Sequence, residues 1–116
     1  MPNIPRTEQR EAARKRALEV REEQRDLFRA IKARRISLAA LLREGPPACM
    51  RRVLMHKLLT TQPHYRDNRF REAMDQAGAG FAKTVEEMTE RQLLIVARDV
   101  EEWEKTHPIA AEEMAV

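Results

Sequence analysis

The residues with the greatest capacity for covalent or metal chemistry are His56, His64, His107 and the single Cys49. Glu104 and His107 stand three positions apart, as in di-iron helical bundles, but such bundles use two pairs and two further carboxylates. Nothing near Cys49 in the sequence indicates a partnered base, and no glycine-rich phosphate loop occurs. We therefore predict a non-enzymatic protein with no metal, no cofactor and no small-molecule substrate.

The spacing of the arginines in the first third of the chain indicates a binding surface for an anion. At about 100° per residue, a helix over positions 7–35 has three distinct faces. Its basic face spans an arc of roughly 100° and consists of Arg10, Arg14, Arg21, Arg25, Arg29 and Lys32. This face extends for about 33 Å, close to one turn of duplex DNA, so several guanidinium groups can meet successive phosphates. The basic face is therefore predicted to bind the DNA backbone.

The other two faces of this helix leave alternatives open. An apolar stripe, which we expect to pack against another element, consists of Ala13, Ala17, Val20, Gln24, Leu27 and Ile31. The acidic face consists of Glu8, Glu11, Glu19, Glu22 and Asp26. One alternative is a solvated helix supported by Arg–Glu pairs three or four residues apart. The other is a coiled-coil dimer along the apolar stripe.

A second basic region surrounds the proline turn between residues 51 and 78. It contains Arg51, Arg52, Lys57, His64, Tyr65, Arg66, Asn68, Arg69 and Arg71. Two helices joined by a short connector are expected here, and the free amides at the start of the second helix attract anions. Tyr65, Asn68 and Arg69 are residue types that reach sugars or base edges. We predict that this region contacts DNA as well.

Charge is divided along the chain. Residues 1–71 hold 18 Lys/Arg against 8 Asp/Glu, a net +10, whereas residues 72–116 hold 4 against 11, a net −7. A basic segment of this size attracts polyanions. The chain of 116 residues is short for an enzyme and fits one small binding domain. With no membrane-spanning run, no secretion signal and one cysteine, the expected location is the cytoplasm, without a membrane partner.

Helix-forming residues dominate and strand signals are almost absent, so the sequence predicts an all-α fold. We expect one domain over residues 1–106 and an acidic tail over 107–116. Ser37, Gly78 and Thr89 are expected helix-boundary residues. The expected helices cover residues 7–35, 38–44, 48–60, 65–77 and 90–105, with a linker before the last one.

This order of elements resembles that of the actinobacterial integration host factor. The resemblance covers roughly residues 8–104. That family has a Leu-Leu pair, a proline turn, a basic recognition helix, a methionine and a terminating glycine. The matching residues here are Lys57-Leu58-Leu59, Pro63, Arg69, Arg71, Met74 and Gly78. The resemblance implies a long first helix followed by a compact helix-two-turns-helix domain.

The resemblance also implies a function. Members of the family are small monomeric, nucleoid-associated proteins that bind duplex DNA with little sequence preference, bend it and can assist phage integration. It implies DNA contacts from Arg69, Arg71 and the arginines of the first helix. After Pro63 the family has a glycine-rich turn, whose amides approach a phosphate closely. This chain has His64, Tyr65 and Arg66 there, and we expect their side chains to replace the amide contacts.

The sequence thus predicts a nucleoid-associated, architectural protein that binds double-stranded DNA mainly through its phosphates and bends or compacts it, with a role in assisting site-specific recombination. We expect a monomer, with a dimer as the alternative. Two other functions stay open: a regulator whose basic half docks an acidic protein surface, and an RNA-binding protein. The aromatic content of 4% argues against the second, because readers of single strands stack bases on aromatic side chains.

Overall fold

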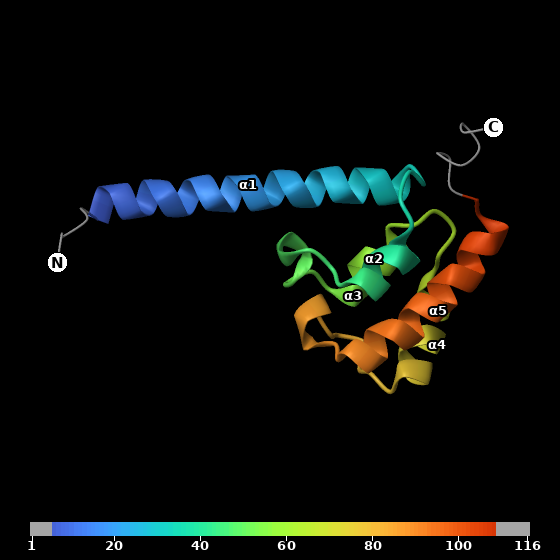
Figure 1. Cartoon of the computed structure of the whole chain (residues 1–116). Coiled ribbons are helices and arrows are strands. Elements are labelled where there is room, and N and C mark those ends of the chain that lie inside the picture. Colours follow the sequence, from blue (N-terminus) through green and yellow to red (C-terminus); the bar gives the residue numbers. More distant parts are fainter. Residues whose placement is uncertain (1–5, 109–116) are drawn as a thin grey trace.

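The computed structural model describes residues 6–108, so the expected acidic tail lies outside the described residues apart from its first two positions. Within this range the protein is all-α, which confirms the predicted fold class and the long first helix (Figure 1). The α-helices are α1 (Arg6–Lys32), α2 (Leu38–Glu44), α3 (Met55–Thr60), α4 (Asp67–Ala77) and α5 (Glu90–Thr106). Two short 3-10 helices are η1 (Ala48–Met50) and η2 (Val85–Glu87).

Helix α1 projects from the rest of the molecule. Its 27 residues extend for about 40 Å, and its N-terminal part reaches beyond the other helices (Figure 1). Every residue over 6–23 is exposed, and Ile31 is the one residue of α1 that is buried. The expected packing of the apolar stripe is therefore wrong for its first half, because Ala13, Ala17 and Val20 are all exposed.

The end of α1 depends on a contact that is distant in sequence. Arg34 has a φ of 59°, in the left-handed region that glycine usually occupies at helix ends, and the amides of residues 34 and 35 complete a Schellman pattern. The Arg34 guanidinium lies 4.5 Å from the centroid of the Trp103 ring and donates a hydrogen bond to the His107 carbonyl. These contacts offset the backbone cost, so α1 ends before residue 35.

The single helix expected over 48–60 is wrong. The chain forms η1, then an extended stretch at Val53 and Leu54, and only afterwards α3. The Val85 amide donates to the Val53 carbonyl at 2.9 Å, and Leu54 forms an isolated antiparallel bridge with Thr84. Because these partners come from a distant part of the chain, helix propensity alone could not reveal the interruption.

The expected helix boundaries are confirmed where they depend on local hydrogen bonds. The Ser37 hydroxyl accepts from the Ala40 amide at 3.1 Å and caps α2. Gly78 ends α4 with a φ of 68°, in the left-handed region that favours glycine. Thr89 and Gln92 form a capping box at the start of α5. These residues interact with neighbours in the sequence, so their roles can be predicted without the tertiary fold.

Helix α5 holds the small domain together. Its buried apolar side chains belong to one core cluster with the buried side chains of the other helices. Its acidic side chains have partners inside the domain: Glu104 accepts from the Ser37 hydroxyl at 2.8 Å, and Glu101 forms an ion pair with Arg43 of α2. Part of the negative charge of the C-terminal third therefore attaches α2 to α5 and is not free to act on a partner.

Candidate nucleic-acid interface

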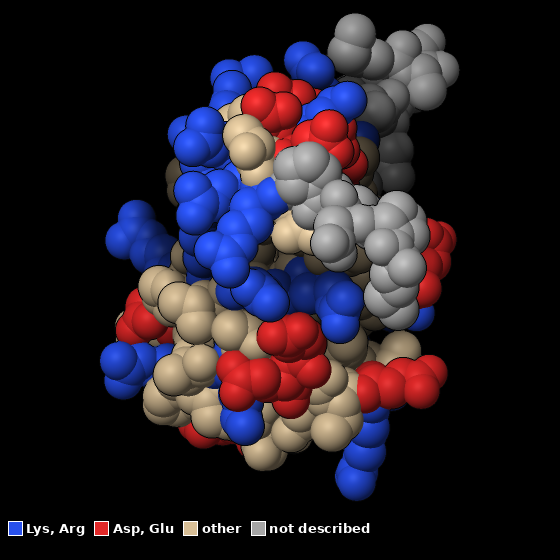
Figure 2. Space-filling model, turned by 90° about the vertical axis from the view of Figure 1, so that its left-hand side faces the viewer, with Lys and Arg blue, Asp and Glu red and all other residues tan. Residues whose placement is uncertain are grey.

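All six side chains of the basic face of α1 are exposed. Figure 2 shows Lys and Arg side chains gathered along one side of the upper part of the molecule, where α1 lies, and just below it. Over residues 6–108, no Lys or Arg of α1 is in an ion pair. The Arg–Glu pairing required by the solvated-helix alternative is therefore not seen here, and the guanidinium groups are free to meet an anion.

A basic groove of about 460 Å³ runs between α1 and α3. Its cationic lining residues are Arg21, Arg25, Arg29, Lys32 and Lys57. Lys57, which the sequence placed with the second basic region, lies with its Nζ 5.1 Å from the centroid of the Phe28 ring of α1. The fold thus brings part of that second region against the basic face and creates one continuous cationic surface.

A second cleft adjoins this groove on the other side of Gln24, and Arg21 lines both. It contains Arg51 and Arg52 from the segment that follows η1. The Gln24 side-chain amide donates to the Cys49 carbonyl, which attaches α1 to η1 at this point. Residues from both predicted DNA-binding regions are thereby brought together. Arg21, Arg51 and Arg52 share the cleft, and Lys57 lies in the adjoining groove.

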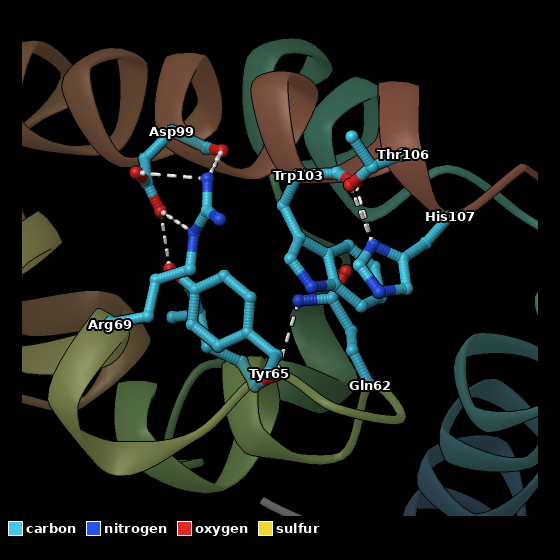
Figure 3. A network of polar contacts seen from close by, with 8 residues as sticks. Gln62, Tyr65, Arg69, Asp99, Trp103, Thr106 and His107 are labelled. Carbon is cyan, nitrogen blue, oxygen red and sulfur yellow. Dashed lines mark hydrogen bonds and ion pairs between the residues drawn. The ribbon is translucent and has the colours of Figure 1, made fainter.

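The structure places two other predicted contacts in an internal network between α4 and α5 (Figure 3). Tyr65 is only 2% exposed, and its hydroxyl donates to the Asp99 carboxylate at 2.6 Å. The Arg69 Nε donates to the same carboxylate at 3.2 Å, and the Arg69 side chain is 37% exposed. The prediction that Tyr65 contacts DNA is therefore wrong, because its ring and hydroxyl are buried. Arg69 primarily joins α4 to α5.

The Tyr65 hydroxyl makes stability sensitive to alkaline pH. Burial, followed by the hydrogen bond to Asp99 and its negative charge, raises the pKa of Tyr65 well above its usual value. Above about pH 10 the unfolded chain loses this proton while the folded protein retains it, so stability present below that pH is lost as pH rises. We expect urea titrations at increasing pH to show a steeper loss for the wild type than for Tyr65→Phe. Equal pH dependence would contradict this role.

The remaining predicted contacts lie on α4 and its connector, outside both clefts. His64, Arg66, Asn68 and Arg71 are all exposed. The start of α4, which was expected to attract anions, carries the Asp67 carboxylate, and this lies 2.9 Å from Arg71 Nε. A carboxylate in the first turn already compensates the helix dipole and repels a phosphate. The expected anion site at this helix start is therefore weaker than its sequence suggested.

Over 6–108, His, Cys, Asp and Glu side chains do not gather in any group of three or more that could hold a metal ion. None of the helices in that range combines the length and the apolar character needed to cross a membrane. Cys49 is buried, and burial raises the pKa of its thiol, which disfavours the reactive thiolate.

One residue of the candidate interface could not be predicted from the sequence. Arg16 falls outside the basic arc of α1, yet it lines the cleft that contains Arg51 and Arg52. Its position on the helix indicated no partner, because the opposite wall of the cleft comes from a segment more than thirty residues further along the chain. Only the packing of η1 against α1 could have revealed it.

The geometry defines an all-α protein with a projecting helix whose basic face continues into two clefts of a small domain. Comparisons of the chain with known protein families, with curated proteins and with solved structures found no match. The resemblance to the actinobacterial integration host factor therefore stays a prediction.

Proposed function

We propose that this protein is a non-enzymatic, nucleoid-associated architectural protein that binds duplex DNA through its phosphate backbone and bends or compacts it. A supporting role in site-specific recombination belongs to the same proposal. The observation that carries it is the basic face of α1, where six cationic side chains are exposed without an ion-pair partner among residues 6–108. Lys57, Arg51 and Arg52 extend this surface onto the domain.

The charge pattern of α1 favours contact with the backbone over insertion into a groove. A helix in the major groove, which is about 12 Å wide, has phosphates on both sides. The acidic face of α1, with Glu19 and Glu22, lies next to its basic face and would meet one of those phosphate rows. If α1 lies along the phosphate backbone of a single strand, its acidic face points away from the phosphates and this repulsion is avoided. Because phosphates carry no sequence information, this mode supports binding with low sequence specificity.

The shape of the protein supports bending. Arg10 and Arg14 of the basic face lie on the projecting part of α1, whereas the groove with Lys57 and the cleft with Arg51 and Arg52 lie where α1 meets the domain. A duplex that contacts both regions gains phosphate contacts, and such contacts can offset the elastic cost of bending, which is on the order of 1–6 kcal/mol for a short site.

The direct test is a titration of a random duplex of about 30 base pairs at several salt concentrations, with donor and acceptor dyes at its ends. If six to ten phosphates are engaged, the slope of log K against log salt should be roughly −5 to −9. Energy transfer should rise on binding, and duplexes of different sequence should bind about equally. Absence of binding at low salt, or strong preference for one sequence with little salt dependence, would contradict the proposal.

A further inference from the structure

The cleft between α1 and the segment that follows η1 is a strongly cationic cavity. Its volume is about 500 Å³, and Arg16 and Arg21 enter it from α1 while Arg51 and Arg52 enter it from the opposite wall. Glu86 is the acidic residue of its lining, and its carboxylate is 3.8 Å from Arg51 Nε. Within the described chain the other three arginines have no ion pair. The cleft therefore holds a large excess of positive charge.

The floor of the cleft is apolar. Ala17 and Val20 of α1 line it, and Val20 is 40% exposed. Both residues belong to the half of the apolar stripe that stays exposed. At one end, the hydrogen bond from the Gln24 side chain to the Cys49 carbonyl fixes the position of α1 against η1. The cleft thus combines an apolar floor with cationic walls.

We propose that this cleft is the anchoring site for the DNA backbone, in which consecutive phosphates of one strand lie between the arginines of the two walls and the intervening sugar packs on the Ala17–Val20 floor. Guanidinium groups bind phosphate oxygens in a bidentate manner, and four of them from two walls surround a strand better than a single helix face. The inference rests on the proposed function and assigns its strongest contacts to a site built by tertiary packing.

A free polyphosphate or nucleotide offers the same phosphate chemistry as a DNA strand. Two features favour the strand. The four arginines of the cleft are exposed, so a chain can lie along it, and Arg21 also lines the adjoining groove that contains Arg25 and Lys57. A strand can continue from one cavity into the next, whereas a small anion would occupy one and leave the other empty.

The first test removes Arg51 and Arg52, the two arginines of the cleft wall opposite α1. Arg51→Ala/Arg52→Ala should weaken binding of the random duplex by about tenfold or more and reduce the salt slope by about 2. The matched control is Arg91→Ala/Arg98→Ala, which removes two exposed charges from α5 outside both α1 cavities. The control should change affinity less than about threefold. Equal losses in the two variants would overturn the cleft assignment, because only net charge would then matter.

The second test changes the floor. Val20→Glu places a carboxylate inside the cleft, and it should weaken duplex binding by about tenfold. Ala12→Glu adds the same charge to an exposed position of α1 that does not line the cleft, and it should have a much smaller effect. Both positions lie on the exposed part of α1, so circular dichroism should show folded proteins. A similar effect of the two substitutions would contradict the proposed floor.

Competition with inorganic pyrophosphate separates the two sources of phosphate. The proposal expects pyrophosphate to displace the duplex only at concentrations where it also screens charge generally. Tight pyrophosphate binding that is lost in Arg51→Ala/Arg52→Ala, with duplex binding unchanged, would overturn the DNA assignment in favour of a small anion. If the wild type binds no duplex at low salt, the proposed function itself fails. If the wild type binds but both cleft variants match their controls, only the anchoring site fails.

Discussion

Arg69→Glu is expected to lower the free energy of unfolding by about 3 kcal/mol, because it breaks an internal ion pair and leaves two carboxylates close together. Arg69 donates to Asp99, whose side chain is only 17% exposed and also accepts the Tyr65 hydroxyl. Loss of the cation therefore leaves Asp99 poorly compensated at the junction of α4 and α5. For a domain of this size, we expect the melting temperature to fall by roughly 10 °C or more.

The matched control for this prediction is Arg66→Glu. This substitution makes the same change of charge three residues earlier in the chain. The Arg66 side chain is exposed and lies outside the Asp99 network. Thermal unfolding of the two variants should differ clearly, with Arg66→Glu close to the wild type. If Arg69→Glu instead retains the wild-type melting temperature and loses DNA affinity alone, the recognition role that the sequence suggested for Arg69 would be restored.

Arg21→Glu/Arg25→Glu is expected to weaken duplex binding by about a hundredfold near 0.1 M salt, the largest effect on affinity among the variants considered. Arg21 and Arg25 both line the groove between α1 and α3, and Arg21 also lines the adjoining cleft. The substitution removes two phosphate contacts and adds two charges that repel the backbone. The magnitude of the salt slope should fall by about 2. Fluorescence anisotropy across a salt series measures both quantities.

Stability should be almost unchanged in this variant, because both side chains are exposed and neither is in an ion pair within residues 6–108. The charge-matched control is Arg91→Glu/Arg98→Glu on α5. If the control loses as much affinity as the α1 variant, binding reflects total charge and not the basic face. If neither variant loses affinity, α1 returns to the solvated-helix interpretation and the nucleic-acid proposal loses its main support.

Several carboxylates of the acidic C-terminal third form contacts inside the domain. Its net charge of −7 would repel DNA if it were free at the surface. Three of its carboxylates instead hold the domain together: Asp99 accepts from Tyr65 and Arg69, Glu101 pairs with Arg43, and Glu104 accepts from the start of α2. Charge that looks unpaired along a chain can be paired in space.

Local sequence patterns are sufficient to predict the all-α class, the long basic first helix and the helix boundaries at Ser37, Gly78 and Thr89. These features depend on interactions within one or two turns, where spacing along the chain equals proximity in space. The exposed basic face of α1 belongs to the same group, since helical periodicity alone places its side chains on one side.

Which of the remaining basic residues share a surface depends on the tertiary packing. It placed Arg51, Arg52 and Lys57 against α1, added Arg16, and turned Tyr65 into the core. It also interrupted the expected third helix by backbone pairing with the segment before η2. Each of these outcomes depends on contacts between segments distant in sequence, whose free energy comes from burial and packing that no local pattern encodes.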